Sequence, residues 1–444
     1  MKRLIAAGAG LAGLALWAPV NGADLLQFLR DARANDAQYA SARAALEAGR
    51  EKLPQGRALL YPTLTGSANT IWNDGEVRSR SAAPGPFPRQ FNSNGWSLNL
   101  TQPLVRLQNW EQFKQSEFQV AQAEAQFAQA SQDLILRVAQ AYFDVLASQD
   151  SLAFILAQKA AISEQLAQAK RNFEVGTATI TDTNEAQARF DLATSQEIAA
   201  KNDLEIRKQA LQLIIGKYPE ELTPMRGKVQ ITPPQPAAME QWVESAQSNN
   251  FAVRVQEAAL EIANREIRRS RAGHLPTLDL VGSYSQTGAQ SAVTTGVGSD
   301  FRGSTIGLQL NLPIYSGGGV DSRVRESVAN REKARFDLEN SRRQAALSAR
   351  QSYLGVTNGI AQVRALEQAV VSSETALASN KLGYEVGVRI NIDVLNSQQQ
   401  LFSTKRDLSK ARYDTIVNGL RLKSASGTLA EADIEAINAL LGTD

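Results

Sequence analysis

The side chains that most often carry out catalysis or bind metals are scarce in this chain. Its 444 residues include one histidine, His274, and no cysteine. Serine and aspartate are plentiful, but a nucleophile needs an adjacent base, and neither a second histidine nor a thiol is present to complete such a pair. The lack of cysteine also excludes disulfides, iron–sulfur clusters and thiolate zinc sites. The sequence therefore predicts a protein that is not an enzyme and that uses no metal and no cofactor.

Phosphate and nucleic acid are not predicted ligands either. The glycine run at 317–319 is followed by Val320 and Asp321, whereas a phosphate-binding loop requires a lysine and then serine or threonine. These glycines are expected to let the chain bend from a strand into a helix. With 47 Lys and Arg residues against 45 Asp and Glu residues, the chain lacks the basic excess of a nucleic-acid-binding protein.

The N-terminus has the pattern of a secretory signal. Lys2 and Arg3 precede an apolar stretch, residues 4–20, which is too short and too rich in glycine and alanine for a good membrane-spanning helix. We expect residues 1–22 to be a signal peptide and the mature chain to begin at Ala23. A later apolar run of the roughly 18–20 residues needed for a membrane helix is not found.

The chain contains an internal duplication. Three residues of the first half recur 211 positions later, so that Tyr142, Gly176 and Asp182 correspond to Tyr353, Gly387 and Asp393. A unit built from such repeats buries its faces against neighbours and not alone, so we expect one elongated protomer made of two repeats. The expected parts are a first repeat at about 23–215, a proline-rich linker at 216–238, a second repeat at about 239–425, and a C-terminal segment at 426–444 containing a short helix.

Each repeat contains two segments in which apolar and polar residues alternate. Within residues 95–101 every second residue is apolar, namely Trp96, Leu98 and Leu100, and residues 306–312 follow the same pattern. One apolar and one polar face are typical of strands between lipid and a water-filled lumen. The predicted elements are a strand at 61–72, an exposed loop at 76–93, a strand at 95–101, a strand beginning at 275, a loop at 288–303 and a strand at 306–312.

Very long helices follow these strands. Residues 106–173 contain neither proline nor glycine, and at about 1.5 Å per residue they span on the order of 100 Å. Their apolar residues recur at intervals of three, four or seven, as in a coiled coil. Residues 320–384 form the equivalent helix, and shorter returning helices are expected at 181–215 and 392–424. A further helix is expected at 23–59, broken or kinked at Pro54.

Several motifs match one known family. They are the segment Gly383–Leu395, read GYEVGVRINIDVL, and the shorter stretches 173–176, 180–182, 411–413 and 424–429. With the duplication and the hairpins, the whole mature chain resembles the TolC-type outer-membrane channels, or outer membrane factors, of Gram-negative export systems. The resemblance implies an α+β membrane protein: a homotrimer whose twelve-stranded β-barrel, with four strands per chain, continues into a long periplasmic α-helical barrel.

The same resemblance implies a function and partners. The chain is expected to be the outer-membrane exit duct of a tripartite efflux or type I secretion system, gated at its periplasmic end. Its expected partners are outer-membrane lipid, a periplasmic adaptor of the membrane fusion protein type, and an inner-membrane transporter, with no nucleic acid. It would lie in the outer membrane, with its helical part in the periplasm.

Residues of the gate follow from the matched motifs. The implied gate residues are Gln165, Asp182, Tyr384 and Arg389. We hypothesise that Arg389 pairs with Asp182 and that Tyr384 hydrogen-bonds Gln165. An exposed ion pair contributes only about 0–1 kcal/mol, which suits a closure that a partner must open.

Two further groups of residues are implied near the helical turns. Asp393 should form an acidic ring in the pore, while the family's second acidic ring falls on Asn396, which is neutral, so cation selectivity should be weaker than usual. The turns should contact the adaptor through Val175, Gly176, Thr177, Val386, Gly387 and Val388.

An alternative interpretation is a periplasmic coiled-coil adaptor protein. Adaptors have one long helical hairpin flanked by small β-domains, whereas this sequence has two hairpins and paired amphipathic strands. A diffusion porin is less consistent still, because its strands would occupy the whole chain. The sequence does not identify the exported substrate.

Overall fold

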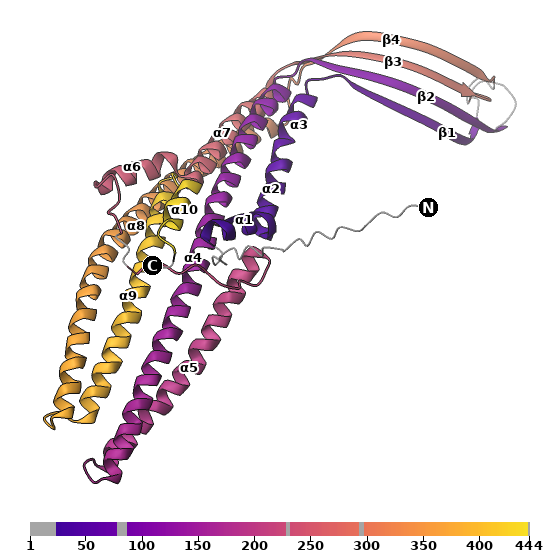
Figure 1. The fold of residues 1–444 in the computed structure, drawn as a ribbon. Coiled ribbons are helices and arrows are strands. Elements are labelled where there is room, and N and C mark those ends of the chain that lie inside the picture. The colour runs from indigo at the N-terminus through magenta and orange to yellow at the C-terminus, as the bar shows by residue number, and fades with distance from the viewer. Residues whose placement is uncertain (1–23, 78–86, 228–230, 293–296, 443–444) are drawn as a thin grey trace, which may run out of the picture.

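A computed structural model describes residues 24–77, 87–227, 231–292 and 297–442. A four-stranded sheet lies at one end of a long helical body, and two helical hairpins extend from the other end (Figure 1). The predicted signal peptide, 1–22, lies outside the described residues.

The sheet is antiparallel throughout, in the order β1-β2-β3-β4. Its strands are β1 (Thr63–Val77), β2 (Phe87–Val105), β3 (Thr277–Ala289) and β4 (Ser299–Asn311). All four exist as predicted, but they are longer than expected, and the predicted bounds of both loops were wrong. Pairing continues in register out to Val77 opposite Phe87, because a single proline, Pro88, removes only one donor from a strand.

The strand register sorts side chains onto two different faces. Leu64 lies opposite Leu100, Leu98 lies opposite Tyr284, and Leu280 lies opposite Leu308, so all four strands place apolar side chains on the same face. On the other face hydroxyl groups meet across strands, as between Ser283 and Thr305 at 2.8 Å. Much of the apolar face is uncovered, with Leu308 67% exposed. A surface of this kind requires apolar surroundings.

The long helices match the sequence prediction closely. They are α4 (Leu107–Glu174), α5 (Ile180–Ile215), α8 (Gly319–Glu385) and α9 (Asn391–Ala425). Each boundary agrees with prediction to within one or two residues, since the glycine-containing turns and the proline-rich flanks end helices strongly. In the described part of the chain, no helix combines the length and apolarity needed to cross a membrane.

The helices that precede each pair of strands were predicted less well. The expected single helix at 23–59 is three helices, α1 (Leu25–Asn35), α2 (Ala37–Arg50) and α3 (Lys52–Ala58). The main break lies at Asp36, whose extended backbone caps α2 while its carboxylate accepts the Tyr39 N–H at 2.6 Å. Pro54 lies in the first turn of α3, where proline is tolerated.

The second repeat contains helices that the sequence analysis did not predict. They are α6 (Met239–Asn249), α7 (Phe251–Arg271) and the 3₁₀ turn η1 (Ala272–His274). Asn250 caps α7 by accepting the Ala252 N–H at 2.9 Å, in the way that Asp36 caps α2. The predicted C-terminal helix is present as α10 (Glu431–Asn438).

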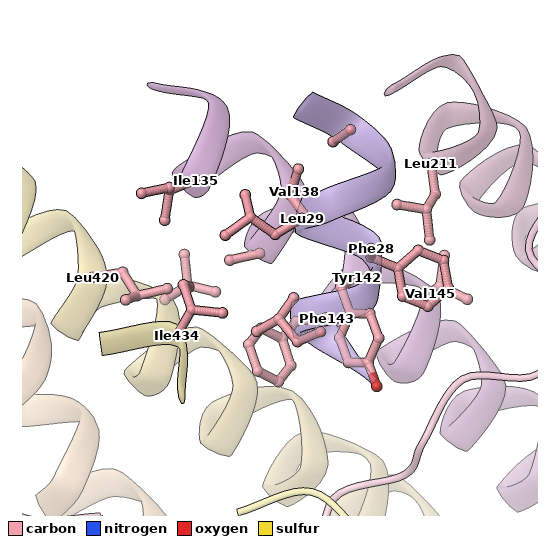
Figure 2. Packing of buried hydrophobic residues seen from close by; sticks show 14 of the residues in the cluster. Phe28, Leu29, Ile135, Val138, Tyr142, Phe143, Val145, Leu211, Leu420 and Ile434 are labelled. Atoms are coloured by element: carbon pink, nitrogen blue, oxygen red, sulfur yellow. The ribbon is translucent and has the colours of Figure 1, made fainter. Parts of the chain in front are cut away.

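The main hydrophobic core lies where both repeats meet, midway along the helical body. Tyr142 of α4 is fully buried and packs edge-on against Phe28 of α1 with ring centroids 5.4 Å apart. Leu211 of α5, Leu420 of α9 and Ile434 of α10 complete the cluster (Figure 2). Helices of both repeats and of the C-terminal segment thus share one core, so the two repeats form one body.

The duplicated tyrosines fasten the segment between the repeats. Tyr142 donates its hydroxyl to the carbonyl oxygen of Thr223 at 2.7 Å, and Tyr353 donates to that of Ala237. Both acceptors lie in the predicted linker, 216–238. A β-bridge from Met225 to Leu441 adds a third attachment. The linker is therefore held against the middle of the helical body.

A partly buried ion pair joins the sheet to the helices. Arg106, between β2 and α4, donates two hydrogen bonds to the carboxylate of Asp279 on β3, at 2.7 and 2.5 Å. Asp279 is 6% exposed. Because the two residues come from different repeats, the pair fixes the direction in which the sheet leaves the helical body.

Replacing Asp36 with alanine should destabilise the fold. The change removes a helix cap and leaves Arg137 without the carboxylate it contacts at 2.9 and 3.0 Å. We expect a loss of about 2–4 kcal/mol in the free energy of unfolding at neutral pH, measured by urea denaturation followed by helical circular dichroism. Asp203→Ala, which removes only a 3.5 Å surface contact with Arg207, is the control and should lose at most about 1 kcal/mol.

The loss of stability caused by Asp36→Ala should become smaller as the pH falls. Burial tends to raise the pKa of Asp36, but hydrogen bonds from Arg137 and from the Tyr39 N–H outweigh it, so the folded pKa lies below the usual value. The stabilisation is therefore complete above about pH 4, the unfolded pKa, and is lost as the pH falls through the folded pKa. An equal difference between wild type and variant at pH 2 and pH 7 would contradict this account.

Candidate functional site

The two helical turns farthest from the sheet have the same geometry. Gly176 and Gly387 have φ angles of 79° and 76°, a left-handed conformation that other residues adopt only with strain. In both turns a backbone N–H reaches back five residues, from Thr177 to Asn172 and from Val388 to Gly383, each at 2.8 Å. The turns expose apolar side chains, with Val388 79% exposed.

The equivalent carboxylates behind these turns have different partners. Asp182 forms a capping box with Thr179, accepting its N–H at 3.0 Å and its hydroxyl at 2.7 Å. The position equivalent to Thr179 in the second repeat is Ile390, which has no hydroxyl group. Asp393 instead lies 3.6 Å from the guanidinium of Arg389.

The two predicted gate contacts are not formed within one chain. Arg389 contacts Asp393 and not Asp182, whose Oδ2 accepts hydrogen bonds from Thr179. Tyr384 accepts a hydrogen bond from the side-chain amide of Asn172 at 3.2 Å, and Gln165 is not its partner. The side-chain amide oxygen of Gln165, Oε1, is buried and has no hydrogen-bond partner among the described residues.

A second link between the hairpins was missed by the sequence analysis. Arg189 of α5 donates to the side-chain oxygens of Asn396 at 2.9 Å and Gln399 at 2.5 Å, both on α9. Arg189 lies seven residues after Asp182, two helical turns further along the same face. That spacing was a usable signal, but which helix would face Arg189 could not be read from the sequence.

Apolar packing also joins the hairpins near the turns. Leu395 of α9 is 2% exposed and packs into a cluster formed by α4 and α5. The members of that cluster are Ile162, Leu166, Ala169, Ala186 and Ala193, with Phe190 against them. The small alanines let the helices approach closely, so Leu395 acts as the apolar contact beneath the polar links.

Further from the turns, buried polar groups tie the hairpins to the core. Tyr413 of α9 donates its hydroxyl to Asp150 of α4 at 2.8 Å and stacks on Phe143 with ring centroids 5.6 Å apart. Burial raises the pKa of Asp150, an effect that the bond from Tyr413 partly offsets. Within the first hairpin, hydrogen bonds from Lys159 and Lys201 lower the pKa of Glu197 to about 2. The hairpins are thus firmly held at the core and more lightly held at the turns.

Comparison with known proteins agrees with this architecture. The family model described as outer membrane efflux protein matches residues 28–217 and 242–428. The chain is 34% identical over 445 residues to the outer membrane protein TolC of Vibrio cholerae, covering 99% of this chain and 98% of that protein. It is 33% identical over 412 residues to the alkaline protease secretion protein AprF of Pseudomonas aeruginosa, covering 91% and 84%.

A solved structure shares the fold over nearly the whole chain. The Campylobacter jejuni CmeC outer membrane channel superposes with a TM-score of 0.79 at 16% identity, covering 99% of this chain and 98% of that one. Four antiparallel strands, two long helical hairpins and a duplicated family match define a channel protein of the outer membrane. The chain belongs to the outer membrane efflux protein family. It is an efflux or secretion channel of the TolC and AprF type, which decides against the alternative of a periplasmic adaptor.

Replacing Leu395 with alanine should loosen the turns without unfolding the core. Leu→Ala substitutions at buried sites lose roughly 2–5 kcal/mol, and here the loss falls on the contact between hairpins. We expect faster hydrogen exchange in residues 391–400 with unchanged protection around Tyr142. Leu382→Ala, at a site that is 62% exposed, is the matched control and should leave the exchange unchanged. Equal exchange in the two variants would argue against a packed contact at Leu395.

Proposed function

We propose that three copies of this chain form the exit duct, with a twelve-stranded barrel in the outer membrane and a helical tunnel in the periplasm. The observation that carries the proposal is the sheet. Its edge strands, β1 and β4, each pair with only one described strand, while one face is apolar and the other polar. Lipid offers no hydrogen-bond partners, so every backbone donor and acceptor of a strand within it must pair with protein. Pairing β4 of one copy with β1 of the next satisfies both edges.

The proposed gate lies at the glycine turns and works between chains. One oxygen of Asp182, Oδ1, accepts no hydrogen bond from the described residues, and Arg389 has only a 3.6 Å contact with Asp393. Both groups therefore keep the capacity to pair across neighbouring copies. Threefold repetition of weak pairs holds the end closed, and a partner needs only a modest difference in affinity to open it.

The exposed turns are the proposed docking surface for a periplasmic adaptor. Val175 and Val388 are 73% and 79% exposed, and the glycine beside each leaves the backbone accessible. An adaptor helix that packs there would connect the duct to an inner-membrane transporter. Relatives include secretion proteins named for proteases and a cation efflux protein, so the proposed cargo is either a secreted protein or a small solute.

Single-channel conductance in planar bilayers tests the proposal. Wild type should conduct weakly, and Arg389→Ser should raise the conductance several-fold, because the variant removes the guanidinium from the closing contact. Asp182→Asn, which keeps an oxygen for the helix cap, should do the same. Arg343→Ser removes an exposed pair with Glu339, far from the turns, and should match wild type.

Two results would contradict the proposal in different ways. A large wild-type conductance unchanged by Arg389→Ser would remove these residues from the gate. An absence of conductance in every variant would remove the duct itself. If Arg389→Ser raises the conductance and Asp182→Asn does not, Arg389 would remain a gate residue, but its partner would be Asp393 and not Asp182.

A further inference from the structure

A polar stripe runs along the start of α9 on the side away from its buried face. The buried side is formed by Val394, Leu395 and Leu401. The stripe consists of Asp393, Asn396 and Gln399, at intervals of three residues, which places them on one side of a helix. Asn396 and Gln399 are exposed and Asp393 is partly exposed within one chain. This stripe includes both positions expected to face the pore.

Arg189 binds this stripe from the neighbouring hairpin. Its two terminal nitrogens reach different residues of α9, Nη2 to Asn396 Oδ1 at 2.9 Å and Nη1 to Gln399 Oε1 at 2.5 Å. The planar guanidinium thus spans one turn of α9 with two diverging bonds. A lysine at this position has a single nitrogen and would not reach both acceptors with the same geometry.

The charge of Arg189 is not neutralised by these contacts. Both acceptors are neutral amides, and no described carboxylate forms an ion pair with Arg189. By contrast, Arg389 at the start of the stripe lies beside Asp393. The stripe therefore carries a compensated pair at one end and an uncompensated cation one turn further along.

We infer that Arg189 is a selectivity-determining residue of the channel and also a brace between the two hairpins. The inference rests on the proposed function and on the expectation from the sequence that Asp393 and Asn396 of this stripe face the pore. Three copies of Arg189 would put a positive ring beside the acidic ring of Asp393. A ring of fixed cations repels permeating cations and attracts anions, so the constriction should discriminate little between them.

The two roles depend on different properties of the side chain. The selectivity role depends on charge alone, because it acts through the field in the constriction. The bracing role depends on the two hydrogen bonds that connect α5 to α9. Arg189→Lys keeps the charge and loses one of the bonds, whereas Arg189→Gln loses the charge as well.

Reversal potentials and conductances measured in a potassium chloride gradient separate these roles. Arg189→Gln should shift the permeability ratio several-fold towards potassium and should raise the conductance. Arg189→Lys should raise the conductance while leaving the ratio near that of wild type. Arg171→Gln is the control, since Arg171 is an exposed cation near the same turns that donates no side-chain hydrogen bond to a described residue. It should leave both readings unchanged.

Each outcome decides a separate claim. An unchanged permeability ratio in Arg189→Gln overturns the selectivity role, and an equal shift in Arg171→Gln reduces it to a general effect of net charge. Unchanged conductance in both Arg189 variants overturns the brace. Arg389→Ser, recorded in the same membranes, keeps these failures distinct from failure of the gate, because its opening is expected whether or not Arg189 acts.

Discussion

The structure depends first on the hydrogen-bonding requirement of a sheet with two free edges. Four strands with one apolar and one polar face can be stable in lipid only if every backbone donor and acceptor at the edges is paired. One chain cannot meet this requirement, since β1 and β4 end the described sheet. The position of the sheet determines the direction of the helical body, because α4 follows β2 directly. The bidentate contact of Arg106 with Asp279 fixes the angle between the sheet and α4.

Below the sheet, the packing between the two hairpins becomes less extensive along the helical body. The core around Tyr142 joins helices of both repeats, and the bond between Tyr413 and Asp150 extends this joint towards the turns. Beyond it the hairpins meet through Leu395, through Arg189 and through the bond from Asn172 to Tyr384. In the proposed gate, a movement that opens the far end would break these polar links and the packing of Leu395 among the described residues, while the core remains intact.

Much of this fold was predictable from sequence. Periodicity and the lack of proline, together with the lack of glycine in α4, predicted α4 and α8 nearly to the residue, and alternation predicted the four strands. The break at Asp36 was not predicted, because an aspartate inside an alanine-rich stretch caps a helix only if the backbone turns there. The helices at 239–271 were overlooked although their apolar residues recur at helical spacing. Strand ends were also placed wrongly, since cross-strand pairing continued through Pro88 against local preference.

The two glycine turns were predictable in position, but the contacts beside them were not. The offset of 211 residues located both turns, and it also shows why Asp182 and Asp393 differ, since Thr179 is replaced by Ile390. That comparison could have been made from sequence alone. The contacts of Arg189 and Asn172 could not, because they depend on how α5 and α8 lie beside their neighbours in space. Contacts between chains, such as that proposed for Arg389 with Asp182, lie beyond what one chain can form.

The difference between Thr179 and Ile390 also has a consequence for symmetry. In the proposed trimer, two similar hairpins per chain give a body with approximate sixfold symmetry about the duct axis. The acidic group freed by Ile390 occurs only once per chain, so the charges at the narrow end obey threefold symmetry. A protein that recognises the shape of the glycine turns would find six comparable positions, whereas one that recognises charge would find three.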